Sequence, residues 1–321
     1  MSLTTIVLVG ANGNLGPSIL TALLNAKPKL SITVLTRSSS KSTYPTASNL
    51  TIKTISDDFP SAELENVFRG QDAVTTTVTG SKSDLQVRIA DAAATAGVRR
   101  FIPADFGSCD SDSERALKLV PLYVGKKKVR EHLIKICSSS NNANDTNGKG
   151  GGMSWTSLVC GHFFDYGLRS NLLQFDLKNR RAILFDGGEI KWSTSTLPFI
   201  GKAVVSILQH EEETRNRMLY VQSFRTTQRE VLKALEKATG DQWTVEDVKS
   251  EEFIKTTGNE MAKEPNNAEV IDEMVSVVGI IDTDWTDRGE DFANDLLGLK
   301  EEDLDEVVKA IVAEQRNAPA V

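Results

Sequence analysis

The sequence predicts a doubly wound α/β fold, in which helices cover both faces of a parallel sheet, followed by a second, smaller α/β lobe. Over the first 105 residues, short and almost wholly apolar segments alternate with helical ones, which is typical of parallel strands buried on both faces. The first apolar segment leads directly into a glycine-rich turn. The chain has 321 residues, a length at which one core usually divides into two.

The elements of the first domain follow one another without a long gap. Aliphatic and β-branched residues fill the strands, and apolar residues at helical spacing mark the helices. In chain order the expected strands are Thr5–Val9, Ile32–Leu35, Leu50–Ile55, Ala73–Val78 and Arg100–Pro103, and the helices between them are Ser18–Asn25, Ser61–Phe68 and Asp84–Ala96. A longer helix is expected from Leu122 to Ile136, after the break at Pro121, and a sixth strand from Trp155 to Cys160. Residues 1–160 are therefore predicted to form the first domain.

The pattern is looser beyond this point, and residues 161–321 are predicted to form mainly the second lobe. A strand near residues 217–222 and a helix over residues 227–239 are expected to return to the first domain. That helix opens with the capping box Thr227-x-x-Glu230, and an acidic helix near Glu301–Glu314 closes the lobe. Within the first domain, Ser138–Gly152 holds no large apolar residue, so we expect a flexible surface insertion there.

Composition excludes several classes of protein. The formal net charge of −7 argues against nucleic acid or an anionic membrane as a partner, because binding phosphates requires excess Lys and Arg. No apolar run is long enough to cross a bilayer, and the three cysteines are too few for a disulfide framework. No Cys/His or carboxylate spacing indicates a metal. We expect a cytoplasmic monomer or homodimer that binds a small-molecule substrate.

The glycine-rich turn has the form GxxGxxG between a strand and a helix. In this position glycines permit a tight turn and a close approach of the backbone to a pyrophosphate, which the helix N-terminus then faces. The alternative is a turn that only needs left-handed backbone angles. The candidate dinucleotide-binding residues of the turn are Gly10, Asn12, Gly13, Asn14, Leu15 and Gly16.

The end of the second strand predicts which dinucleotide binds. An NAD site usually carries Asp or Glu there, but this chain has no acidic residue before Asp57. Instead the strand ends in Arg37, followed by three serines and Lys41. A guanidinium can hold a 2′-phosphate by two parallel hydrogen bonds, so Arg37, Ser38 and Lys41 indicate NADP or NADPH.

Several segments together resemble a known family. GANGNLG, the VLTR that ends the second strand and the segment QVRIADAAATAGVRRFIPADFG (Gln86–Gly107) are similar to the isoflavone reductase-like, NmrA-like branch of the atypical short-chain dehydrogenases/reductases. Lys126–Arg130 and Trp155–Phe164 also match, so the resemblance spans roughly residues 4 to 245. Ala104-Asp105 stand where the family usually has Ser-Glu. The resemblance implies an NADPH-dependent reductase of the phenylcoumaran benzylic ether or pinoresinol-lariciresinol type, with a Rossmann-like domain and a smaller substrate lobe.

The resemblance points to Lys126 as the catalytic lysine, and helical phase supports this independently. Leu122, Lys126, Val129, Leu133 and Ile136 fall on one stripe of the predicted helix, whereas Lys128 lies on the opposite side. A lysine that is partly removed from water has a lowered pKa and can exchange a proton near neutral pH. Lys126 is therefore expected to touch both cofactor and substrate. The alternative is a lysine that extends from the core edge to water.

A competing catalytic pair lies on the same helix. Tyr123-x-x-x-Lys127 has the YxxxK spacing of the typical short-chain dehydrogenases, with Ser108 or Ser111 upstream. In that scheme the tyrosine is the acid and the lysine lowers its pKa. Tyr123 and Lys127 remain runner-up catalytic residues.

Other residues are expected around the cofactor and the substrate. Thr77, Thr79 and Gly80 follow the fourth strand and would lie beside the cofactor, and the resemblance suggests that Phe106 packs on the nicotinamide. An aromatic cluster follows the sixth strand and could line a substrate pocket, with His162 donating to a substrate oxygen, or could simply be core. Its members are His162, Phe163, Phe164 and Tyr166.

The function predicted from the sequence is reduction of a small, aromatic or phenolic secondary metabolite by NADPH. The alternative from another class is an NmrA-like regulatory protein that senses NADP(H) without turnover. The inward-facing lysine and the aromatic cluster favour the enzyme.

Overall fold

The computed structural model describes residues 2–140 and 152–317, and these form two compact units. Unit 1 consists of Met1–Phe106, Leu122–Leu158 and Ile200–Leu219. Unit 2 consists of Gly107–Pro121, Val159–Phe199 and Tyr220–Val321. The chain therefore passes between the units several times. The sequence analysis expected a boundary near residue 160 and a return to the first domain over residues 217–222 and 227–239.

Unit 1 is built on a seven-stranded sheet with the order β11-β6-β5-β4-β1-β2-β3. Neighbouring strands from β6 to β3 pair in parallel, as the alternation of apolar and helical segments predicted. The strands are β1 (Thr5–Val9), β2 (Ser31–Arg37), β3 (Leu50–Ile55), β4 (Ala73–Thr76), β5 (Arg100–Ile102), β6 (Ser154–Val159) and β11 (Arg217–Tyr220). The order reverses direction at β1, so the carboxyl ends of β1 and β4 form the crevice edge typical of nucleotide-binding folds.

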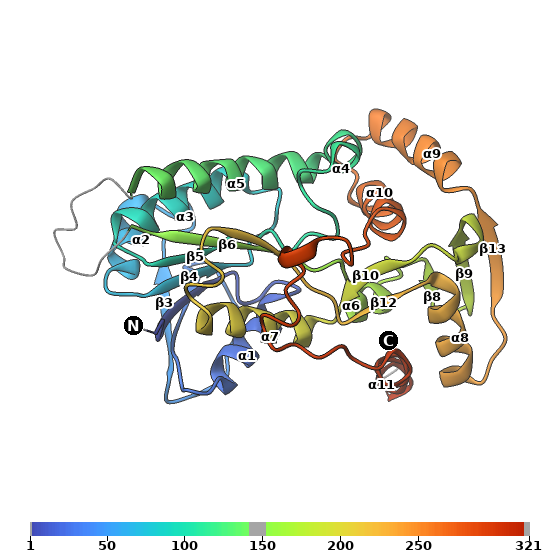
Figure 1. The fold of residues 1–321 in the computed structure, drawn as a ribbon, viewed down its shortest axis with the longest axis horizontal. Helices are drawn as coiled ribbons and strands as arrows, with labels where there is room; N and C mark the ends of the chain where they lie inside the picture. The colour runs from blue at the N-terminus through green and yellow to red at the C-terminus, as the bar shows by residue number, and fades with distance from the viewer. Residues whose placement is uncertain (1, 141–151, 318–321) are drawn as a thin grey trace. The chain divides into compact units, whose positions relative to one another are not determined.

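Helices cover both faces of this sheet (Figure 1). On one face lie α2 (Ser61–Phe68), α3 (Ser83–Thr95) and α5 (Pro121–Ser140), and on the other lie α1 (Gly16–Asn25) and α7 (Leu197–Gln209). Gly201 of α7 packs so closely on α1 that a Cβ there would lie 2.7 Å from the carbonyl oxygen of Ser18. The doubly wound arrangement predicted from the sequence is thus confirmed.

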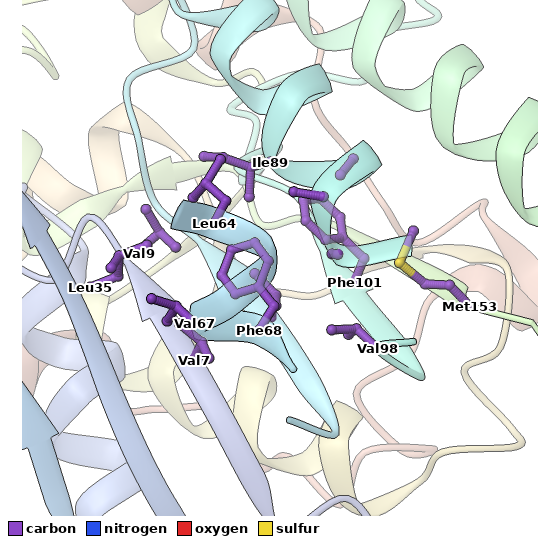
Figure 2. Packing of buried hydrophobic residues seen from close by; sticks show 14 of the residues in the cluster. Val7, Val9, Leu35, Leu64, Val67, Phe68, Ile89, Val98, Phe101 and Met153 are labelled. Carbon is purple, nitrogen blue, oxygen red and sulfur yellow. The ribbon is translucent and has the colours of Figure 1, made fainter. Parts of the chain in front are cut away.

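The core beneath α2 and α3 comes from alternate residues of the strands and from one side of each helix (Figure 2). Val7 and Val9 of β1, Phe68 of α2 and Phe101 of β5 meet there, and none is more than 1% exposed. Burial of such side chains contributes about 1.5–3 kcal/mol each. This packing fixes the strand ends that carry the candidate site.

Unit 2 contains two three-stranded sheets with the orders β12-β10-β7 and β13-β9-β8. Their strands are β7 (His162–Phe163), β8 (Phe175–Asp176), β9 (Arg181–Phe185), β10 (Trp192–Ser195), β12 (Phe224–Thr226) and β13 (Thr244–Val248). The helices of this unit are α4 (Glu114–Leu119), α6 (Phe164–Arg169), α8 (Gln228–Thr239), α9 (Ser250–Lys263), α10 (Ala268–Ile281) and α11 (Leu304–Asn317). Both parallel and antiparallel pairs occur in these sheets.

Two expectations need correction or limitation. The capping box at Thr227 and Glu230 is formed, with Glu230 N donating to Thr227 Oγ1 at 3.1 Å, but α8 belongs to unit 2 and packs against α11 and β9. A cap fixes where a helix begins, not which element its apolar side meets. The predicted insertion Ser138–Gly152 falls mostly outside the described residues, and its first three residues extend α5.

Within the described ranges, no helix combines the length and the apolar character that a bilayer crossing requires.

Candidate active site

Two of the three glycines in the turn after β1 are required by the protein's own packing. Gly10 has φ +95°, and a Cβ there would lie 2.8 Å from the hydroxyl oxygen of Thr77. A Cβ on Gly16 would overlap the carbonyl oxygen of Gly10. Thr77 closes the turn by donating its hydroxyl to the Gly10 carbonyl at 2.7 Å. The predicted cofactor residue Thr77 therefore shapes the loop from β4.

The middle glycine has no such role within the protein. The nearest atom to a Cβ on Gly13 would be 3.6 Å away, an ordinary contact, and Gly13, Asn12 and Asn14 are all exposed. Leu15 is buried at the start of α1, and no side chain caps the first N–H groups of this helix. A helix start without a side-chain cap, behind an exposed glycine at which a Cβ would have no close neighbour, fits a pyrophosphate.

The end of β2 carries the predicted 2′-phosphate residues and one acid that the sequence analysis did not place there. Arg37 and Lys41 are exposed. The Ser38 hydroxyl donates to Asp57 Oδ1 at 2.9 Å, and the Ser39 N–H donates to the same oxygen at 3.0 Å. Hydrogen bonds from Ser39 and Ser38, together with the nearby charge of Arg37, hold the pKa of Asp57 below its usual value. Ser38 is thus used to brace its own loop.

Lys126 points into unit 1, as helical phase predicted. Its side chain is 9% exposed, and its ammonium donates to the backbone carbonyl of Asp105, which follows β5. Gly80 and Gly125 allow this approach, because a Cβ on Gly80 would overlap Leu122 and lie 3.3 Å from Lys126 Cε. The loop that follows β4 therefore brings Lys126 to the same sheet edge as the glycine turn.

The neighbouring residues of α5 are placed differently. Lys128 is 58% exposed and pairs with Asp84 at 2.6 Å. Lys127 lies 3.8 Å from Glu131 on a half-exposed side of the helix. The buried Tyr123 presents its ring to Lys126, with 5.3 Å between Nζ and the ring centroid. Tyr123 is thus next to Lys126 as well as four residues before Lys127.

A buried polar cluster that the sequence analysis missed lies beside Lys126. Asp105 Oδ2 accepts from Ser157 Oγ of β6 at 2.7 Å and lies 3.2 Å from an Arg130 guanidinium nitrogen on α5. The Gln86 side chain of α3 accepts from the Ala104 N–H at 2.9 Å. Arg130, one turn after Lys126, was the one signal available from the sequence, because i and i+4 share a helix face.

Phe106 and the remaining cofactor candidates also lie in unit 1. Phe106 is buried, and its φ of +37° is unusual for a residue with a Cβ. Thr79 is exposed and its hydroxyl lies 3.3 Å from that of Ser81.

The aromatic substrate candidates all lie in unit 2 and divide into two groups. His162 is 2% exposed, and its Nε2 donates to the carbonyl of Ser276 at 3.2 Å, so the donor that a substrate role needs is already used. Burial lowers the pKa of His162 to about 4. Phe164 is fully buried against Phe224, with ring centroids 4.7 Å apart. Phe163 and Tyr166 are only half-buried.

Comparison with known proteins places the chain in a family. A sequence model described as the NmrA-like family matches residues 2–143. Oxidoreductase aprR of Aspergillus flavus is 34% identical over 309 residues, which cover 96% of this chain and 98% of the relative. The chain belongs to the NmrA-like family. The NmrA-like protein and its fungal relative thus match over nearly their whole lengths.

Solved structures show the same fold as this NmrA-like protein. AtPrR2 with NADP+ and (+)pinoresinol has a TM-score of 0.73 at 18% identity, covering 97% of this chain and 99% of the other. The leucoanthocyanidin reductase–NADPH complex from Vitis vinifera has a TM-score of 0.71 at 16% identity, with coverage of 96% and 99%. At such identities the likeness concerns the fold, which is the Rossmann-like arrangement with a second lobe that the sequence predicted.

Proposed function

We propose that this NmrA-like protein is an NADPH-dependent reductase that transfers hydride to a small aromatic or phenolic substrate. The observation that carries the proposal is the position of Lys126: a buried ammonium at the same sheet edge as the glycine turn, within one unit. The named oxidoreductase among its relatives supports the reaction class.

The residues of unit 1 fit a dinucleotide. Gly13 leaves room for a pyrophosphate at the uncapped start of α1, and the exposed Arg37 suits a 2′-phosphate. Asp57 holds the loop that follows Arg37 through Ser38 and Ser39. NADPH rather than NADH follows from the guanidinium at the end of β2.

Lys126 supplies the proton or stabilises the negative charge that develops on the substrate. When bound, the nicotinamide provides the hydride. The carbonyl of Asp105 orients the Lys126 ammonium, and burial at 9% exposure limits the access of water. A positioned acid of this kind typically accelerates proton transfer by about 10²- to 10⁴-fold.

The substrate class is proposed from the half-buried Phe163 and Tyr166 and from the reductases of the same fold. The neighbours solved with (+)pinoresinol and named for leucoanthocyanidin support a phenolic substrate. The predicted substrate residues Phe163 and Tyr166 are half-buried in unit 2. Beside them in the chain, Phe164 packs on Phe224 and the His162 ring donates to the Ser276 carbonyl.

The cofactor can be tested by calorimetry with NADPH and NADH. The wild type should bind NADPH more tightly, and Arg37→Asp should weaken NADPH binding far more than NADH binding, because it replaces an attraction by a repulsion. Arg69→Asp, the same charge change at an exposed residue after α2, is the matched control. Equal affinities of the wild type for the two cofactors would contradict the proposal.

The glycine turn offers a second test that separates binding from folding. Gly13→Ala should keep the unfolding temperature, since its methyl group meets no protein atom closer than 3.6 Å. It should weaken NADPH binding, because the methyl group occupies the room left for the pyrophosphate. Gly16→Ala should lower the unfolding temperature because its methyl group overlaps backbone. Reduction is then assayed as loss of NADPH absorbance with a panel of phenolic ketones, ethers and quinones. Binding without oxidation on any substrate would favour the sensor instead.

A further inference from the structure

A buried ion pair lies against the carbonyl that holds Lys126. The Asp105 and Arg130 side chains are 3% and 5% exposed, and Ser157 provides a further hydrogen bond to the same carboxylate oxygen. Asp105, Arg130, Gln86 and Lys126 line one narrow recess. The carboxylate and the carbonyl that receives the Lys126 ammonium therefore belong to the same residue.

The backbone on both sides of Asp105 is fixed, by strain at Phe106 and by a hydrogen bond at Ala104. The backbone of Phe106 has a φ of +37°, a strained value for a residue other than glycine. Gln86 fixes the N–H of Ala104 on one side of Asp105. Asp105 Oδ1 is buried without a hydrogen-bond partner among the described residues. A carboxylate oxygen left in this state is unfavourable.

Stability alone does not account for this arrangement. Replacing a buried ion pair by apolar residues of similar volume is often neutral or stabilising, because removing both charges from water costs as much as their attraction returns. The pair lies one helical turn from Lys126, which suggests that it serves the lysine. In a region of low dielectric, a charge one helical turn away strongly affects the titration of its neighbour.

We propose that Asp105 is a positioning residue for Lys126: its carboxylate offsets the charge of Arg130 and fixes the loop whose carbonyl receives the Lys126 ammonium. The inference rests on the proposed catalytic role of Lys126, but its test requires neither cofactor nor substrate. The groups near Lys126 include Tyr123 and Arg130 from α5 and Asp105 from the end of β5, and α3 and β6 add the neutral Gln86 and Ser157.

The experiment follows the titration of Lys126 itself. The full chain is labelled with ¹³C-lysine, and the Cε signal that disappears in Lys126→Met is followed with pH by NMR. Asp105→Asn keeps the shape and removes the charge, so the Arg130 guanidinium loses its ion pair with Asp105. The titration midpoint of Lys126 should then fall by about one pH unit or more, the usual effect of a like charge within one helical turn.

The double variant Asp105→Asn/Arg130→Met should return the midpoint to within about half a unit of the wild type, because it removes one negative and one positive charge together. Ser157→Ala removes a hydrogen bond without changing any charge and is the matched control, with an unchanged midpoint. If Asp105→Asn does not fold, Arg130→Met alone should raise the midpoint.

Unchanged midpoints in the charge variants, or a fall of the midpoint in Arg130→Met, would overturn the inference. A merely structural ion pair would lower the unfolding temperature without opposite shifts in the two variants. The result also stands apart from the proposed function: a protein that binds no NADPH could still show the shifts, and an active reductase could lack them.

Discussion

Strand β5 has a buried arginine near each of its ends, and the two differ in what balances the charge. At the amino end, Arg100 is 0% exposed, and its hydrogen bonds within the described residues go to neutral oxygens: the hydroxyls of Ser154, Thr156 and Thr214 and the carbonyl of Glu211. The Glu211 carboxylate acts on it only as a nearby charge. At the carboxyl end, Arg130 faces the carboxylate of Asp105 beside Lys126.

The difference separates a structural cluster from a chemical one. Burial lowers the pKa of Arg100 to about 10, yet the group stays charged at neutral pH and ties β5 to β6. The other cluster contains a carboxylate oxygen without a hydrogen-bond partner in the described part of the chain, next to the lysine proposed as the acid. Ligands of open α/β folds bind at the carboxyl ends of strands, so the chemistry is expected there and the stability at the opposite end.

The largest expected effect is at the carboxyl end. Lys126→Met should lower the turnover number by about 10²- to 10⁴-fold and leave NADPH affinity nearly unchanged, because it removes the acid and keeps the glycine turn and Arg37. Stopped-flow and steady-state rates with the best substrate of the panel measure it.

Two variants on the same helix serve as controls. Lys128→Met should have almost no effect, since Lys128 is 58% exposed and pairs with Asp84. Tyr123→Phe removes only a hydroxyl and tests the rival scheme. Loss of turnover in Tyr123→Phe with activity retained in Lys126→Met would show that the Tyr-Lys scheme is right.

The amino end should respond in stability rather than in rate. Arg100→Met leaves three hydroxyls and a carbonyl without their donor, and should lower the free energy of unfolding by about 3 kcal/mol. Urea denaturation measures this change, with NADPH affinity of the folded variant as the second readout. A variant that is as stable as the wild type but binds NADPH poorly would erase the distinction between the two ends.

A smaller effect is expected in unit 2. It tests whether another buried group that bonds to a neutral oxygen also affects stability rather than rate. Since the pKa of His162 is about 4 in the folded chain, the unfolded chain takes up its proton first as the pH falls through about 6.5. Stability should therefore decline from pH 7 to pH 5, with His162 contributing about 2 kcal/mol of the loss.

His162→Asn keeps a side-chain donor and removes the titration, so this part of the pH dependence should be absent from its urea denaturation curves. The same slope in the variant and the wild type would mean that other groups cause the decline.

Local sequence patterns predicted much of unit 1 and the inward lysine, because helical phase and strand alternation act over a few residues. Asp57 could not be placed from such patterns, since it meets Ser38 only through the parallel register in which Arg37 lies beside Ile55. Asp105 likewise needs the pairing of β5 with β6 to reach Ser157.

The second unit was harder to predict for the same reason. The position of His162 after a strand does not reveal that α10 covers its ring, which lies so close to Gly279 that a Cβ there would collide with it. The short helix α4 was not predicted from the sequence, although Ser113 caps its N-terminus. The cap of α8 was visible, whereas its partner α11 lies far along the chain.

The unequal demands on the three glycines after β1 bear on how this lineage can diverge. Gly10 and Gly16 are constrained by the fold itself, so a descendant that ceased to use a nucleotide would still retain them. At Gly13 a Cβ would meet no atom of the described residues closer than 3.6 Å, so in the proposed function it is the ligand that requires a glycine there. Among related genes, drift at the middle glycine with the outer two preserved would therefore mark copies that have kept the architecture and abandoned the coenzyme.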